Sequence, residues 1–147
     1  MFNLFSHVGI VVHDIDAAVS LWTEIFGLRV VDRFLVEAEG VQSVMLSTAG
    51  AHGESTCVEL ISPLADAETP GPIARRLAEN GEGVFHLAFR ISDSAESARA
   101  LRARGIDPVV LLPAGPDNVR RLVVHPKTAN GVLLELLGEQ AAPLRPE

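Results

Sequence analysis

Cysteine is almost absent from this chain. Cys57 is the only one among 147 residues, which excludes an intramolecular disulfide and a site built from several thiolates. Basic residues are also scarce, because 12 Lys and Arg stand against 19 Asp and Glu and leave a net charge of −7. This balance argues against nucleic acid as a partner, since phosphate binding needs a basic face.

Long hydrophobic runs are missing as well. No apolar stretch approaches the roughly 20 residues that a membrane-spanning helix needs. The first residues, MFNLFSHVGI, lack the basic region and apolar run of a signal peptide. We therefore expect a cytoplasmic protein with no membrane partner. Hydrophobic residues still make up 48% of the chain, which is enough for the core of one compact domain.

The pattern of predicted elements occurs twice along the chain. Residues 7–12 and 86–91 read as strands, and a helical pattern follows each of them. In each copy a capping Asp, Asp14 or Asp93, comes seven residues after a His, and a helix-ending Gly comes 20 or 19 residues after that His. Neither half alone could bury both faces of its sheet. We therefore predict an α+β fold made of two paired βαβββ modules.

The predicted helix of the first module runs over residues 14–27. Four of its apolar residues are spaced i, i+3, i+4 and i+7, which predicts one buried face. They are Ala18, Leu21, Trp22 and Ile25. The remaining predicted strands cover residues 29–36, 43–48, 55–62, 107–112, 120–125 and 131–138.

The boundaries between the modules follow from composition. A Pro-rich linker precedes a short helix that has Pro72 at its first position and Gly81 beyond its end. We predict a single domain throughout. Its parts are module one over 5–63, the linker and short helix over 64–82, module two over 83–138 and a tail over 139–147.

Each predicted module carries one His and one Glu at equivalent places. His7 and His86 lie on the first strands, and Glu59 and Glu135 lie on the last strands, 52 and 49 residues later. Taken one at a time, a strand His is more commonly a hydrogen-bonded core residue and a strand Glu more commonly exposed. Neither Glu lies on an alternating polar face, however, and an ionised carboxylate among apolar neighbours needs compensation. The four together indicate a metal site.

The chemistry of these four side chains narrows the ion. Two imidazoles and two carboxylates form a borderline-hard set that suits Co²⁺, Mn²⁺, Ni²⁺, Fe²⁺ or Zn²⁺. On an octahedral ion, four protein ligands leave two adjacent positions open for a bidentate substrate. His52 lies in the Gly-rich segment AGAHGES, is predicted to be exposed and does not join the set.

Four motifs resemble the vicinal oxygen chelate (glyoxalase/bleomycin resistance/dioxygenase) superfamily, and within it the methylmalonyl-CoA epimerases. They are HVGIVVHDIDAAVSLWTEIFGL, VELISPL, PIARRLAENGEGVFHLAF and HPKTANGVLLEL, and the resemblance covers about residues 7–137. It implies a cupped mixed sheet around one metal ion held by His7, Glu59, His86 and Glu135.

The resemblance also implies an activity. The expected enzyme is a metal-dependent epimerase of methylmalonyl-CoA or a related 2-substituted acyl-CoA, which removes the α-proton through a metal-bound enolate. Glu135 is the first candidate for the catalytic base and Glu59 the second. The expected partners are an acyl-CoA thioester and a second copy of the chain in a homodimer.

Two positions differ from the epimerase pattern. Glu59 stands where many epimerases have Gln, and a Glu there is similar to glyoxalase I. Ser43 stands where some epimerases carry a Glu as second acid/base. The alternatives are a glyoxalase I-type lyase or isomerase acting on a hemithioacetal, a metal-free ligand-binding resistance protein and a ring-cleaving dioxygenase. The C-terminal motif argues against the first, and the complete His/Glu set against the second.

Overall fold

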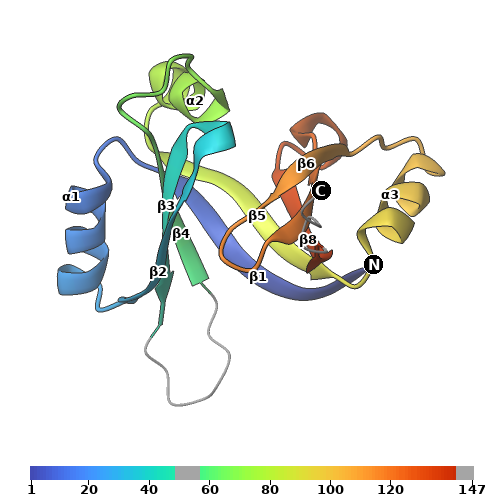
Figure 1. The fold of residues 1–147 in the computed structure, drawn as a ribbon, viewed down its shortest axis with the longest axis horizontal. Coiled ribbons are helices and arrows are strands. Elements are labelled where there is room, and N and C mark those ends of the chain that lie inside the picture. The colour runs from blue at the N-terminus through green and yellow to red at the C-terminus, as the bar shows by residue number, and fades with distance from the viewer. Residues whose placement is uncertain (49–56, 142–147) are drawn as a thin grey trace, which may run out of the picture. The chain divides into compact units, whose positions relative to one another are not determined.

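The structure, a computed structural model, describes residues 1–48 and 57–141 (Figure 1). His52 and the last part of the predicted tail, residues 142–147, lie outside these ranges. The strands are β1 (Phe2–Val11), β2 (Arg29–Val36), β3 (Val41–Ser47), β4 (Cys57–Pro63), β5 (Gly83–Ile91), β6 (Val109–Ala114), β7 (Val119–Val124) and β8 (Leu133–Gln140). The helices are α1 (Ile15–Ser20), η1 (Leu21–Ile25), η2 (Glu37–Glu39), α2 (Pro72–Asn80), α3 (Ser94–Arg102) and η3 (Pro126–Thr128).

The strands form one mixed sheet in the order β2-β3-β4-β1-β5-β8-β7-β6. The strands of the first module are ordered β2-β3-β4-β1, and their equivalents in the second module follow in the reverse order, β5-β8-β7-β6. This is the order expected for two βαβββ modules. β1 pairs with β4 in parallel, whereas β3 pairs with β2 and β4 in antiparallel fashion. The predicted α+β fold with two βαβββ modules is confirmed.

The chain divides into two compact units. The first unit is Ser6–His86, and the second unit is Met1–Phe5 together with Leu87–Glu147. Strands β1 and β5 therefore each contribute residues to both units. The domain boundaries inferred from the sequence repeat stay a prediction.

Helix α1 covers one face of the sheet in the first unit. Asp14 caps it by accepting a hydrogen bond from the backbone N of Ala17 at 3.0 Å. Ile15 and Val19 of α1 pack against a cluster of buried sheet residues. The sheet residues of this cluster are Val44, Leu46 and Leu60.

The predicted buried face of this helix was only partly correct. Ala18 and Trp22 pack against the core, but Leu21 is 46% exposed and Ile25 is 72% exposed. The reason is that the chain continues from α1 into the π-helical turn η1, where Phe26 N donates to Leu21 O. The wider turn changes the angle between successive side chains and directs the later apolar residues to solvent.

Helix α2 packs against the other face of the sheet in the first unit. It spans the predicted residues, with Pro72 in its first turn and Gly81 at its C-cap. Ile73 and Leu77 are buried there. Their buried partners from the sheet are Val11, Val41 and Ile61.

The second unit is organised around α3. Asp93 caps this helix as predicted, accepting from the backbone N of Glu96 at 2.8 Å. The Glu139 carboxylate accepts from the backbone N of Ser94 at 2.9 Å and from its hydroxyl at 2.8 Å. Glu139 belongs to β8, which ends at Gln140, two residues beyond the predicted end of this strand at residue 138. Within residues 1–48 and 57–141, no helix combines the length and the hydropathy needed to cross a membrane.

Candidate functional site

The strand register of the first unit gathers polar side chains on one face of the sheet. In the parallel pair of β1 and β4, His7 lies opposite Cys57 and Gly9 lies opposite Glu59. In the antiparallel pair of β4 and β3, Ser43 lies opposite Ile61, two residues along the strand from Glu59. Because alternate strand residues share a face, His7, Glu59 and Ser43 point to the same side.

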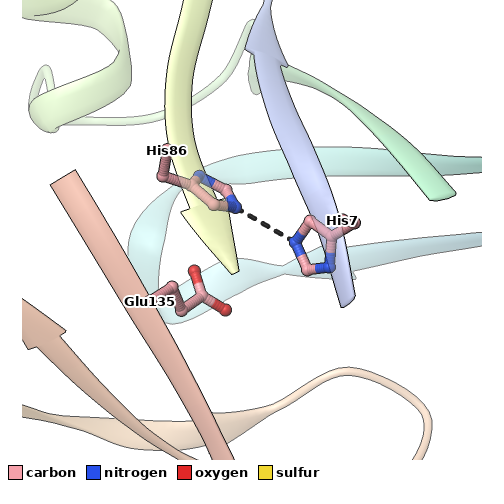
Figure 2. Close-up of side chains that lie close together, drawn as sticks. All are labelled: His7, His86 and Glu135. Carbon is pink, nitrogen blue, oxygen red and sulfur yellow. Dashed lines mark hydrogen bonds between the residues drawn. The ribbon is translucent and has the colours of Figure 1, made fainter. Parts of the chain in front are cut away.

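Three donor atoms converge on this face. The Nε2 atoms of His7 and His86 are 3.0 Å apart (Figure 2). Oε1 of Glu59 lies 3.6 Å from Nε2 of His7 and 3.5 Å from Nε2 of His86. The two imidazole rings are nearly perpendicular, with an interplanar angle of 79°. Within the first unit, the structure thus brings His7, His86 and Glu59 together.

All three side chains are buried. His7 is 4% exposed, His86 3% and Glu59 8%. An ionisable cluster with so little water around it is costly unless its members compensate one another or bind an ion. The burial that we predicted for Glu59 from its apolar neighbours in sequence is therefore present.

The Glu59 carboxyl is held in its ionised form. Burial, the largest effect, would raise its pKa, but the hydrogen bond and charge of His7 outweigh this together with the charge of His86. A hydrogen bond from the Ser43 hydroxyl also lowers the pKa, and the net direction is downward. An ionised carboxylate is the form that coordinates a cation.

Two hydroxyl groups support this cluster from outside. The Ser6 hydroxyl lies 3.1 Å from Nδ1 of His7. When Nδ1 carries the ring proton and donates it to Ser6, Nε2 presents its lone pair to the cluster, as a metal-binding His requires. The Ser43 hydroxyl donates a hydrogen bond to the Glu59 carboxylate and so helps to hold it in place. No feature of the sequence pointed to Ser6. Ser43 drew attention only because some epimerases carry an acid/base Glu at its position.

The spacing of the three donor atoms fits a divalent metal ion. Ligand atoms bound at about 2.1 Å are about 3.0 Å apart at adjacent corners of an octahedron and about 3.4 Å apart in a tetrahedron. The observed separation of 3.0 Å matches the octahedral value, and those of 3.5 and 3.6 Å lie near the tetrahedral value. Two imidazole nitrogens and one carboxylate oxygen also match the preferences of the ions named above.

The fourth predicted ligand, Glu135, belongs to the second unit. It lies on β8 opposite Val123 of β7 and is partly buried. On its strand it shares a face with Leu133 and Leu137. Its predicted part in a metal site, and its predicted role as a base, stay predictions.

A family model described as Glyoxalase/Bleomycin resistance protein/Dioxygenase superfamily matches residues 6–122. The chain belongs to this superfamily. The matched range contains His7, Glu59 and His86, and the resemblance inferred from the four sequence motifs is confirmed at this level.

Several solved structures similar to the chain are methylmalonyl-CoA epimerases. The Mycobacterium tuberculosis enzyme shares 30% identity with a TM-score of 0.81, over 95% of this chain and 90% of that one. A variant of the Streptomyces coelicolor enzyme in complex with 2-nitronate-propionyl-CoA shares 31% identity with a TM-score of 0.82, over 96% and 100%. A methylmalonyl-CoA epimerase in complex with methylmalonyl-CoA and NH4+ shares 31% identity with the same TM-score, over 96% and 97%. No curated protein sequence matches the chain.

Proposed function

We propose that this protein is a metal-dependent epimerase of methylmalonyl-CoA or a related 2-substituted acyl-CoA. The observation that carries the proposal is the buried convergence of two imidazole nitrogens and one carboxylate oxygen. It occurs in a chain that is similar to methylmalonyl-CoA epimerases over nearly their whole length. We further propose that Co²⁺, Mn²⁺, Ni²⁺, Fe²⁺ or Zn²⁺ occupies this site.

His7, His86 and Glu59 would hold the ion, and Glu135 would be its fourth ligand. Two observations support Glu135. It occupies the place in the second module that Glu59 occupies in the first, on the last strand. In the strand order, β8 lies beside β5 as β4 lies beside β1, so the His and Glu of each module come from neighbouring strands.

The side chains then divide the chemistry between them. A bound divalent ion would supply a Lewis acid for the oxygen atoms of the substrate. Glu135 takes the α-proton, so that the C–H bond breaks, an O–H bond forms and the electron pair moves towards the thioester oxygen. A proton from water then bonds to the opposite face of that carbon, and Glu135 releases its proton to solvent. Glu59 is the weaker candidate base, because its lowered pKa favours the ionised ligand over a proton carrier.

Solvent-deuterium exchange tests this activity. The cobalt-loaded protein is incubated with methylmalonyl-CoA in D₂O, the reaction is quenched and deuterium at the α-carbon is measured by mass spectrometry. We expect incorporation that a chelator abolishes and that Glu135→Gln loses. Glu24→Gln, which changes an exposed carboxylate on η1, is the matched control and should exchange like the wild type. Absence of exchange with metal bound would reject this substrate.

A second candidate is an isomerase acting on a hemithioacetal. The specific observation in its favour is that a carboxylate, Glu59, contacts both imidazoles where many epimerases have a neutral Gln. The same metal-loaded protein is offered a hemithioacetal in place of the CoA thioester. Turnover of the hemithioacetal without α-proton exchange in the CoA thioester would select this candidate.

The proposal extends to assembly and location. We propose a homodimer in the cytoplasm, with a small acyl-CoA thioester as the partner molecule. Light scattering after size-exclusion chromatography should give twice the chain mass of 15.7 kDa. A mass of one chain at micromolar concentration would overturn the dimer.

A further inference from the structure

We infer that Gly9 is a positioning residue for His86, and that the missing side chain at residue 9 is what allows His86 to reach the donor cluster. This inference rests on the proposed metal site, which it deepens. Gly9 is buried on β1, two residues from His7 and on the same face. The imidazole of His86, which comes from the neighbouring strand β5, lies across this position.

The geometry leaves no room for a side chain at residue 9. A Cβ atom built there would overlap Cε1 and Nδ1 of His86 and would lie 2.7 Å from its Nε2. All three of these atoms belong to the ring itself. Gly9 does not have a positive φ in this structure, so its backbone conformation does not require glycine. The need for glycine at this position comes from the ring that packs on it.

The consequence for the cluster follows from where the ring must go. His86 is 3% exposed and its Nε2 atom is 3.0 Å from Nε2 of His7. A methyl group at residue 9 would push the ring off β1 and would lengthen its separations from both His7 and Glu59. The obstructing atoms belong to a side-chain ring that can rotate, and none of them is backbone, so the two strands need not move apart. Such a rotation disturbs metal binding, because the ligand atoms must keep their mutual spacing.

A double-mutant cycle between Gly9 and His86 tests the inference. The four proteins are the wild type, Gly9→Ala, His86→Ala and the double variant. Each is titrated with Co²⁺, and its thermal unfolding is followed by circular dichroism. We expect Gly9→Ala to weaken Co²⁺ binding by about 10- to 100-fold with little change in Tm. In the His86→Ala background the same change should alter Co²⁺ affinity less than about twofold, since no ring remains to be displaced.

The expected split between affinity and Tm separates positioning from a merely structural role. Wild-type affinity in Gly9→Ala would overturn the inference. An equal loss of affinity in the His86→Ala background would overturn it too, because Gly9 would then act independently of the ring.

A measurement without metal keeps the inference separate from the proposed function. The imidazole nitrogens of the metal-free wild type and of Gly9→Ala are compared by NMR at one pH. Displacement of the ring should shift the nitrogen signals of His86 and remove its hydrogen bond to His7. If the wild type binds no Co²⁺ but the signals shift as expected, the metal proposal fails and the inference about Gly9 stands. Unchanged His86 signals in Gly9→Ala would overturn the inference whatever the metal result.

Discussion

His7 and His86 are 79 positions apart in sequence, yet their Nε2 atoms lie 3.0 Å from each other. A hydrogen bond between two imidazoles needs one protonated and one unprotonated nitrogen. A cation between the rings removes that requirement, because both nitrogens can then offer lone pairs. Metal binding therefore requires the proton between the two Nε2 atoms to move away, for example to Nδ1 of the same ring.

Glu59→Gln should weaken Co²⁺ binding by more than the roughly 10- to 100-fold that loss of an outer-shell partner costs. The substitution keeps the shape of the side chain but removes the charge that lies 3.6 and 3.5 Å from the two imidazole nitrogens. Calorimetric titration with Co²⁺ measures the change. Glu37→Gln, at an exposed carboxylate on η2, is the control and should bind like the wild type. Equal affinities in Glu59→Gln and the wild type would remove Glu59 from the ligand set.

Ser6→Ala should weaken Co²⁺ binding by about tenfold without loss of the fold. The Ser6 hydroxyl, 3.1 Å from Nδ1 of His7, helps to select the tautomer that leaves Nε2 free for a metal. Ser6→Thr keeps the hydroxyl and should recover most of the affinity. The same titration measures both variants. If Ser6→Ala and Ser6→Thr bind the ion equally well, the hydroxyl has no part in holding His7.

Leu60→Ala should destabilise the protein by about 2–5 kcal/mol. Leu60 is fully buried on β4, in the cluster under α1, so its truncation leaves a cavity and loses apolar burial. Urea unfolding followed by circular dichroism gives the free energy of unfolding. Leu35→Ala is the control in the same unit, because Leu35 is 58% exposed on the edge strand β2. It should change the free energy of unfolding by about 0.5 kcal/mol or less.

Glu139→Gln should reduce stability at neutral pH but not in strong acid. Burial raises the pKa of the Glu139 carboxyl, but the hydrogen bonds from its own backbone and Ser94 and the charge of Arg120 lower it below its ordinary value of 4.5. A carboxyl whose pKa is lower in the folded state stabilises the protein above the unfolded-state pKa. That contribution disappears as the pH falls through the folded-state pKa.

The size of this effect is limited by exposure. The Glu139 side chain is 42% exposed, so solvent screening reduces its contribution to about 1 kcal/mol or less. Urea unfolding at pH 7 and at about pH 3 measures the difference between Glu139→Gln and the wild type. A difference that stays constant between the two pH values would show that ionisation of Glu139 plays no part.

Much of the fold could be predicted because the same βαβββ pattern of elements occurs twice in the sequence. Asp14 and Asp93, at the same offset from His7 and His86, both cap helices as expected. Periodicity could not show that the first helix changes to a π turn at Leu21, because that change depends on packing rather than on residue type. The end of β8 was missed for a related reason. Glu139 reads as a polar tail residue until Ser94, 45 positions away, is seen to donate to it.

The candidate site could likewise be predicted only in part from the sequence. His7, Glu59 and His86 could be found from their equivalent places in the two repeats. The role of Gly9 could not, although strand alternation places Gly9 on the face of His7. A glycine in a strand does not reveal which ring from another strand will lie on it. That knowledge requires the three-dimensional arrangement of β1 and β5.

Both imidazoles and the Glu59 carboxylate belong to one compact unit, Ser6–His86. Ion binding to these three groups would therefore stabilise that unit more than the other unit. Amide hydrogen exchange should then slow on metal addition within β3 and β4, while the amides of α3, in the other unit, are protected less. Because three of the proposed donor groups lie in one unit, the free energy of local opening would differ between the two units of the metal-bound chain.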